Sequence, residues 1–391
     1  MDTNVFPFKE KYIYLNFCGV SPFYNPARLK KEEFEKKQSE MGALVFLEYP
    51  DILDKFHQAV ANLLKTKKEN ISFVKNTAEG LSLIANGYPF ESPEDEIISF
   101  IHEYPSNHYP WKLQEIKKKA KLKLIPNNKN VLLNKNDIPD NYVYGFTLED
   151  IKKLITPKTK IISISHVQFT SGFAINLKEI GEFCKKHHID LIIDAAQSLG
   201  SIPIYPEEYH ISAIASSGWK WLLGPIGSGI LYTSEDFRKK IDYSMVGADI
   251  MIQGMDYLNH TWQPYTDGKK FEYSTTPVSD AIALTECIEN LILKNGIENI
   301  YKHILELHQL FKETCKPSEH IQYLEFPDEN RSGILSLIVN NPQRISLLLR
   351  EKNIISTVRG NYLRIAPHIM ITKEEMRKAA EILNEIINKF T

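Results

Sequence analysis

Cysteine is scarce in this chain, which has Cys18, Cys184, Cys287 and Cys315 among 391 residues. The four lie far apart in the sequence and form no C-x-x-C pair, which excludes the common zinc and redox motifs and a dense disulfide framework. We therefore expect four buried or free thiols.

An excess of charge of either sign is also missing. The 47 Lys and Arg residues and the 49 Asp and Glu residues give a formal net charge of -2, which supplies no field to hold a nucleic acid or an anionic membrane. No apolar run reaches the roughly 18 residues that a membrane span needs, and the first twelve residues lack the apolar core of a signal peptide. We expect a soluble, cytoplasmic protein with neither nucleic acid nor membrane as a partner.

What the chain does contain is an alternation of helical and strand patterns from about residue 147. A helix that begins at Thr147, apolar runs at 161–164 and 191–193, and a helical pattern at 177–184 between the runs form a β-α-β series. Short apolar strands separated by helices predict an α/β fold with a parallel sheet, whose ligands gather beyond the carboxyl ends of the strands. Another apolar run, at 71–74, leads into a helix start at 76–80, a place that suits a phosphate.

The pattern changes after about residue 280. Helical stretches at 281–293 and 297–315 are followed by short strands such as 333–339 and by a terminal helix at 373–390. We predict a large domain over residues 18–278 and a smaller α+β domain formed by residues 1–17 and 279–391.

Lys220 stands out because it lies between Trp219 and Trp221 after an apolar run. Apolar surroundings disfavour the ammonium form, and a lysine with a lowered pKa suits Schiff-base chemistry with an aldehyde. Asp194 ends an earlier apolar run, where a carboxylate costs free energy unless it has a cationic partner such as a pyridinium nitrogen. The alternatives are a surface lysine with a snorkelling side chain and an aspartate that caps the next helix.

These residues resemble the class V family of pyridoxal 5'-phosphate (PLP) enzymes, which includes cysteine desulfurases, kynureninases, isopenicillin-N-epimerase-like proteins and small aminotransferases. The resemblance implies PLP fold type I, with a mostly parallel sheet of the seven-stranded type between helices and a smaller C-terminal α+β domain. The segment from Asp194 to Gly200 is similar to the family's Asp-x-x-Gln-x-x-Gly, so Asp194 would pair with the pyridine nitrogen and Gln197 would meet the phenolic oxygen. Lys220 matches the lysine that holds PLP as a Schiff base and, with Asp194, would be catalytic.

The resemblance implies further contacts to the cofactor. Thr77, Ala78 and Ser217 match positions that bind its phosphate, and Trp219 stands where relatives carry His or Tyr on the same phosphate, with packing as its other possible role. Tyr104 matches the residue that stacks on the pyridine ring. Gln168, in a segment similar to kynureninase and epimerase relatives, stands near the place of an Asn that approaches the phenolic oxygen.

Two more segments resemble the family's substrate and subunit contacts. Phe271 to Thr275 is similar to Phe-Glu-x-Gly-Thr, although Ser274 replaces the glycine, and this implies a homodimer in which Thr275 completes the neighbouring site. Arg364 matches the arginine that binds the α-carboxylate of an amino-acid substrate through its bidentate fork. Arg359 is a second candidate anion contact, with an exposed loop arginine as its alternative.

The segment from Ser356 to Tyr362 lacks the nucleophilic cysteine that desulfurases carry just before this arginine. This argues against persulfide-forming desulfuration, so we do not expect a typical cysteine desulfurase. We predict an aminotransferase or a β-eliminating C–S lyase that acts on a small amino acid through Lys220. An epimerase-like or kynureninase-like enzyme is the alternative.

Other interpretations are weaker. Ser217 to Lys220 also reads S-x-x-K, as in acyl-serine hydrolases, but the companion S-D-N and K-T-G motifs are absent. A non-catalytic binding protein would have no need to bury the charges of Asp194 and Lys220. We predict no metal site, because His102 and His108 lack the spacing of H-E-x-x-H and Pro105 lies between them.

Overall fold

A seven-stranded sheet is the centre of the computed structural model, which describes residues 4–390. Its order is β2-β8-β7-β6-β5-β3-β4, and β8 is antiparallel to both of its neighbours whereas the other neighbouring pairs are parallel. The strands are β2 (Ile71–Val74), β3 (Glu96–Phe100), β4 (Lys121–Ile125), β5 (Thr159–Ser165), β6 (Asp190–Asp194), β7 (Ala213–Ser217) and β8 (Gly229–Thr233). The predicted fold class is confirmed.

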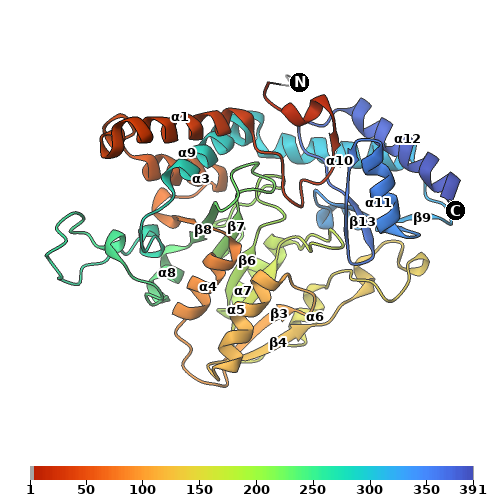
Figure 1. Cartoon of the computed structure of the whole chain (residues 1–391). Coiled ribbons are helices and arrows are strands. Elements are labelled where there is room, and N and C mark those ends of the chain that lie inside the picture. The colour runs from red at the N-terminus through yellow and green to blue at the C-terminus, as the bar shows by residue number, and fades with distance from the viewer. Residues whose placement is uncertain (1–3, 391) are drawn as a thin grey trace.

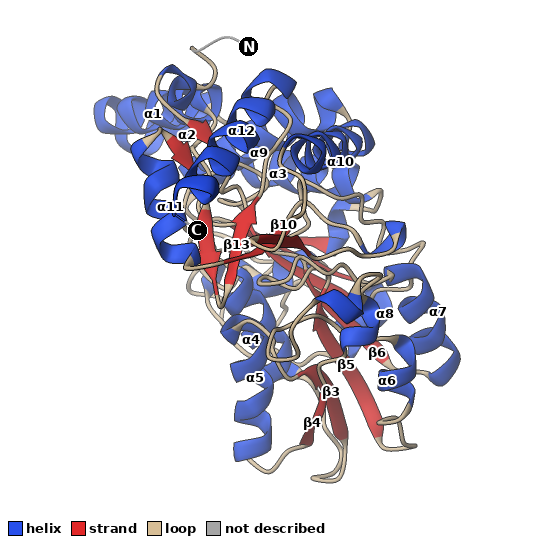
Figure 2. Ribbon diagram, turned by 90° about the vertical axis from the view of Figure 1, so that its right-hand side faces the viewer, coloured by secondary structure: helices blue, strands red, loops and turns tan. Residues whose placement is uncertain are grey.

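Helices cover both faces of this sheet, which explains why its central strands are continuous apolar runs. Every residue of β3, β6, β7 and β8 is buried. Figure 2 shows α4 (Thr77–Gly87) and α5 (Pro105–Ile116) on one face and α6 (Leu148–Lys152) and α7 (Leu177–His187) on the other. The predicted start of α6 is present as a capping box between Thr147 and Asp150.

The C-terminal part forms a second, four-stranded sheet in the order β12-β13-β10-β9. These strands are β9 (Ile321–Tyr323), β10 (Leu335–Val339), β12 (Thr357–Arg359) and β13 (Tyr362–Ile365), and α10 (Ile297–Thr314), α11 (Pro342–Glu351) and α12 (Lys373–Phe390) accompany them. The N-terminal β1 (Ile13–Tyr14) joins this part by pairing in parallel with β11 (Ile354–Ile355). One cluster of buried side chains runs through both parts, and the domain boundaries at 18 and 278 stay a prediction. Residues 1–3 and 391, which the predicted small domain includes, lie outside the described residues.

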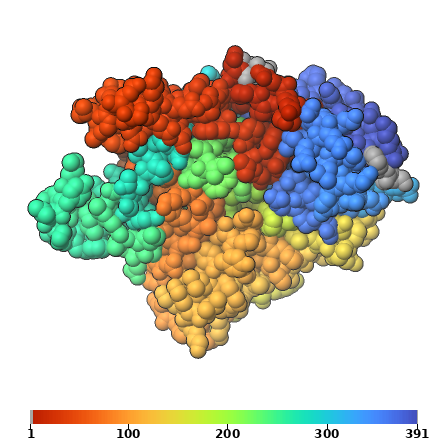
Figure 3. All heavy atoms as spheres, in the orientation of Figure 1, coloured from red at the N-terminus to blue at the C-terminus, as the bar shows by residue number. Residues whose placement is uncertain are grey.

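A layer of helices crosses the top of the molecule in Figure 1. It consists of α1 (Asn25–Met41), α2 (Val45–Glu48), α3 (Ile52–Leu64) and α9 (Val278–Cys287), and a π-helical stretch at Ile288–Leu293 continues α9 through the helix predicted at 281–293. After α8 (Glu235–Lys240), residues 251–267 project away from the body; we call this segment the arm. Figure 3 shows the arm as a separate lobe at the left of the molecule. Among residues 4–390, no helix has both the length and the apolar character needed to cross a membrane.

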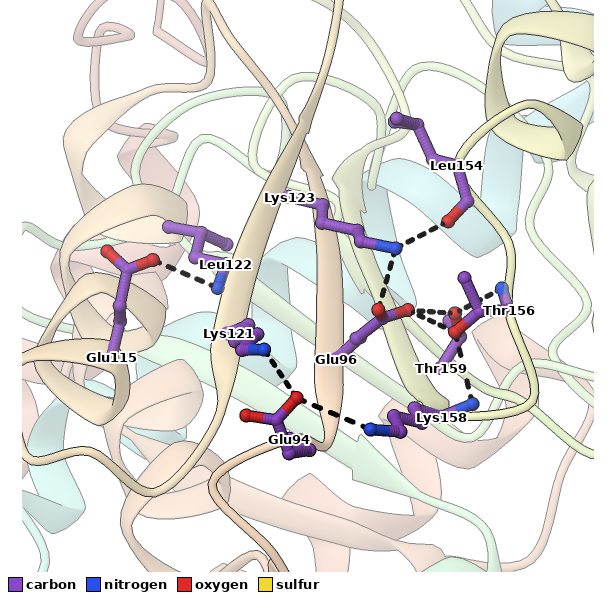
Figure 4. A network of polar contacts seen from close by, with 10 residues as sticks. All are labelled: Glu94, Glu96, Glu115, Lys121, Leu122, Lys123, Leu154, Thr156, Lys158 and Thr159. Atoms are coloured by element: carbon purple, nitrogen blue, oxygen red, sulfur yellow. Dashed lines mark hydrogen bonds and ion pairs between the residues drawn. The ribbon is translucent and has the colours of Figure 1, made fainter.

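The amino ends of β3 and β5 are held by a polar network at the edge of the sheet opposite to the carboxyl ends (Figure 4). The buried Glu96 carboxylate accepts hydrogen bonds from Thr156 and Thr159 at 2.7 and 2.9 Å and pairs with Lys123 at 2.7 Å. These bonds satisfy a charge that would otherwise be costly to bury. They stabilise the amino-end edge of the sheet and do not involve the carboxyl ends of the strands, where ligands bind in such folds.

Candidate active site

A cavity of about 550 Å³ lies beyond the carboxyl ends of β2, β6 and β7. The sheet directions explain its place, because the carboxyl ends of parallel strands meet at one edge. The cavity brings together all the predicted site residues except Gln168 and Thr275: Thr77, Ala78, Tyr104, Asp194, Gln197, Ser217, Trp219, Lys220, Arg359 and Arg364.

The cavity wall contains the buried Asp194 carboxylate and the half-buried Lys220 amine. Asp194 is the last residue of β6, and the backbone N–H of Ala196 donates to its Oδ1 at 2.9 Å. Burial raises the pKa of Asp194, and the bond from Ala196 and the charge of Lys220 act against the rise. Burial likewise lowers the pKa of Lys220, with Asp194 as the strongest opposing charge. The lowered pKa favours the neutral, nucleophilic amine that Schiff-base chemistry requires.

Another part of the cavity wall has groups that could bind an anion. Thr77 and Ala78 are the first residues of α4, whose first backbone N–H groups have no partner within the helix and lie at the positive end of its dipole. Asn76 caps this helix by accepting from the Glu79 N–H at 2.8 Å. The buried Ser217 Oγ has no hydrogen-bond partner in the protein. A phosphate in this position would satisfy Ser217 and the helix start together.

Aromatic and amide side chains also line the cavity. Tyr104 is 43% exposed, its ring centroid lies 5.6 Å from Lys220 Nζ, and it makes an edge contact with Phe169 at 5.2 Å. Gln197 accepts from the Trp221 indole N–H at 3.1 Å and donates to the Cys18 carbonyl at 2.9 Å. An aromatic face therefore lies beside the amine, and Gln197 is held in place on the cavity wall.

Two arginines come from the C-terminal sheet. Arg364, on β13, is 1% exposed, and its guanidinium donates to the Phe169 carbonyl while its Nε has no partner. Burial lowers the pKa of Arg364. An unsatisfied buried guanidinium N–H that faces a cavity is a site for a carboxylate. Arg359, at the end of β12, is exposed and lines the same cavity.

Two predicted residues lie elsewhere. The Gln168 carbonyl oxygen accepts from the backbone N–H groups of Thr170 and Ser171, and its amide nitrogen donates to the His102 carbonyl at 2.9 Å, so this side chain holds a turn and is not part of the cavity wall. Thr275 is exposed and outside the cavity of its own chain, and its role at a neighbouring site stays a prediction. Within residues 4–390, no group of three or more His, Cys, Asp or Glu side chains is placed to hold a metal ion.

Sequence analysis missed the N-terminal strap, which we define as residues 13–21. Tyr14, Asn16 and Cys18 of this strap line the cavity, together with Gly19 and Val20. The strap is fixed to the lysine loop by Ser21, whose hydroxyl donates to the Lys220 carbonyl at 2.6 Å across 199 positions of sequence. No local sequence pattern predicts the contact between Ser21 and Lys220, because it depends on long-range contacts such as the pairing of β1 with β11.

The fold and the cavity together define a class of protein: an α/β enzyme whose cavity contains a lysine, a buried carboxylate, a helix start that could bind an anion and an arginine that could bind a second one. The family described as Aminotransferase class-V matches residues 45–362. The chain belongs to that family.

Individual relatives agree with this assignment. A protein named probable cysteine desulfurase from Methanothermobacter thermautotrophicus is 25% identical over 403 residues, which cover 97% of this chain and 96% of that protein. The cystine C-S lyase C-DES, solved with its reaction product cysteine persulfide, has a TM-score of 0.86 and 21% identity over 97% of this chain and 99% of that one. A lysine-to-alanine variant of C-DES, with glycine covalently linked to its PLP cofactor, has a TM-score of 0.86 and 20% identity over 98% of this chain and 99% of that one. At these identities the two C-DES structures show that the fold is shared.

Proposed function

We propose that this chain is a PLP-dependent C–S lyase that acts on a small sulfur-containing amino acid. The observation that carries the proposal is a single cavity lined by Lys220, Asp194, Ser217 and Arg364, in which Ser217 Oγ and Arg364 Nε have no hydrogen-bond partner among the described residues. The names of the relatives, a cysteine desulfurase and a cystine C–S lyase, favour C–S cleavage over the transamination that the sequence leaves equally open.

The residues fit PLP group by group. Ser217, Thr77 and Ala78 would hold the phosphate, Lys220 would hold the aldehyde carbon, and Asp194 would pair with the pyridine nitrogen. A protonated pyridine nitrogen is the cationic partner that a carboxylate as buried as that of Asp194 needs. When bound, PLP supplies an electron sink for the pair left behind when a bond at the substrate Cα breaks.

Three residues of the chain would transfer protons and orient the substrate. The Lys220 amine removes the proton from Cα, and its lowered pKa keeps it available as a base. Asp194 holds a proton on the pyridine nitrogen, which keeps the ring electron-poor. Arg364 binds the α-carboxylate through its fork and thereby orients the substrate against Lys220.

We also propose that the enzyme is not a cysteine desulfurase with its thiol on the loop before the carboxylate-binding arginine. β12 ends at Arg359 and β13 begins at Tyr362, so only Gly360 and Asn361 connect them. Gly360 has a φ of 55°, as tight hairpin connections require. This connection contains no cysteine.

A homodimer with shared sites is the assembly we propose. Thr275 is exposed, and the nearby arm carries exposed apolar side chains, among them Leu258 at 93% and Met255 at 84%. Apolar surface concentrated on a projecting segment is typical of a subunit contact. Mixing inactive Lys220→Ala and Thr275→Ala chains tests this, because a mixed dimer has one site with both residues intact. Activity that does not reappear in the mixture would contradict the shared site.

The experiment that tests the function records the absorption spectrum of the PLP-loaded protein while alanine, serine, cysteine, cystine and kynurenine are added singly, with product analysis. We expect spectral change and release of reduced sulfur with cysteine or cystine in the wild type and in the surface control Lys239→Ala, and neither in Lys220→Ala. Formation of pyridoxamine phosphate without sulfur release would identify a transaminase instead. A protein that binds no PLP would refute the proposal.

A further inference from the structure

One of the four cysteines occupies a different environment from the rest. Cys184, Cys287 and Cys315 are 0% exposed and belong to the hydrophobic core. Cys18 lies on the N-terminal strap and forms part of the cavity wall that contains Lys220. All four thiols are free and buried, as expected, and Cys18, 2% exposed and part of the same core cluster, differs from the others because it also lines the cavity.

Cys18 is held close to the groups that would grip a substrate. Its carbonyl accepts from Gln197 at 2.9 Å, and Ser21, three positions later, bonds to the backbone of Lys220. Burial lowers the pKa values of Lys220 and Arg364, and Cys18 acts on both in the opposite direction. Its thiol donates a weak hydrogen bond to the side-chain oxygen of Asn16 at 3.7 Å.

A second observation shows that a ligand belongs beside this thiol. The buried Arg364 Nε has no hydrogen-bond partner among the described residues and lines the same cavity as Cys18, so a carboxylate bound there would satisfy it. If the substrate carboxylate binds Arg364 and the substrate Cα lies beside Lys220, only the short side chain of the amino acid remains to be positioned in the cavity. Cys18 lies near both anchoring groups, within reach of that side chain.

We propose that Cys18 is the acceptor of sulfur from a cysteine substrate bound in this cavity. This inference rests on the proposed function. The Cys18 thiolate, having passed its proton to the amine of Lys220, attacks the substrate sulfur. A sulfur–sulfur bond forms as the Cβ–S bond breaks, and the electron pair of the broken bond passes to carbon, which takes the proton from Lys220.

The products are alanine and a persulfide on Cys18, and the atoms balance without an external oxidant. Carbon gains the two electrons that the pair of sulfur atoms gives up. The thiol reaches the substrate from the N-terminal strap, on the opposite end of the chain from the β12–β13 connection, which has no cysteine. A thiol on the strap would allow the persulfide formation against which the missing loop cysteine argues.

The test uses PLP-loaded protein incubated with cysteine in the absence of reductant, then trapped with iodoacetamide and analysed by peptide mass spectrometry. We expect the Cys18 peptide to gain one sulfur atom in the wild type and in the matched control Cys184→Ala. In Cys18→Ser and Cys18→Ala the adduct disappears and alanine formation falls roughly tenfold or more. The PLP absorption of each variant shows that its site is assembled.

The outcomes separate this inference from the proposed function. If pyruvate and free sulfide form at equal rates in the wild type and in Cys18→Ala, with no adduct on Cys18, the protein is a C–S lyase and the role of Cys18 is wrong. If cysteine causes no C–S cleavage in the wild type, the proposed function fails and the Cys18 step fails with it. Persulfide on another cysteine would also overturn the inference.

Discussion

Ser217 offers a test in which one substitution has opposite effects on the empty and the loaded protein. Its hydroxyl is buried at 3% exposure and has no partner, although it lines the cavity beside the start of α4. In the empty protein this hydroxyl costs free energy, because a buried polar group without a hydrogen bond costs about 1 to 3 kcal/mol. Ser217→Ala should therefore leave the free energy of unfolding of the empty protein unchanged or raise it.

In contrast, the same substitution should weaken the binding of PLP. A hydrogen bond to a charged group contributes about 1.5 to 3 kcal/mol, so loss of the bond to phosphate should weaken PLP binding by roughly ten- to a hundredfold. Titration of the empty protein with PLP, followed by absorbance, gives the affinity. Thermal unfolding without PLP gives the stability.

The neighbouring serine is the matched control. Ser216 lies one position earlier on β7, and its hydroxyl donates to the Ala195 carbonyl at 3.2 Å. Ser216→Ala should lower the stability of the empty protein by about 1 kcal/mol and leave the affinity for PLP nearly unchanged. Pyridoxal, which lacks the phosphate, should bind the wild type and Ser217→Ala equally well. A Ser217→Ala protein that binds PLP as tightly as the wild type would refute the placement of the phosphate.

Three further predictions concern two cavity residues, Asp194 and Arg364, and one residue outside the cavity lining, Glu103. Asp194→Ala should lower kcat by at least about a hundredfold while some PLP binding remains, because no carboxylate keeps the pyridine nitrogen protonated; an unchanged kcat in steady-state assays would contradict this. Arg364→Lys should raise KM for the amino acid by roughly ten- to a hundredfold through loss of the bidentate fork, and equal KM values would exclude Arg364 as the carboxylate site. Burial raises the pKa of Glu103 to about 7 against hydrogen bonds from Ser165, so the stability contributed by its protonated form is present below pH 4.5 and is lost as the pH rises through 7. Urea unfolding of the empty protein should show a loss on the order of 3 kcal/mol across this range that is absent in Glu103→Gln, and identical pH dependence of the two proteins would refute the assignment.

The sheet and the heart of the site follow from short-range patterns. The apolar runs around Ile161 and Ile192 are strands buried on both faces, and such strands must be covered by helices. Asp194 ends the strand around Ile192, Ser217 ends its parallel neighbour β7, and parallel neighbours bring strand ends together. Their meeting could therefore be predicted before any coordinates were known.

The remaining features depend on long-range contacts that leave no local pattern. Nothing in the local sequence distinguishes Cys18 from the other three cysteines, because long-range contacts, such as the pairing of β1 with β11 and the bond from Gln197 to the Cys18 carbonyl, bring its strap to the cavity. Gln168 was expected at the cofactor, but the backbone N–H groups of Thr170 and Ser171 occupy its carbonyl oxygen. Competition of this kind between a side chain's possible partners is decided by tertiary structure.

Lys220 is the residue on which the whole account depends, and chemical reduction of the PLP-loaded protein tests it most directly. Borohydride fixes PLP to the lysine that holds it as an imine, and peptide mass spectrometry then identifies that lysine. We expect the reduced PLP label on the peptide that contains Lys220, and we expect no label at this position in Lys220→Ala. A label on another lysine, or no label on a protein saturated with PLP, would contradict the account.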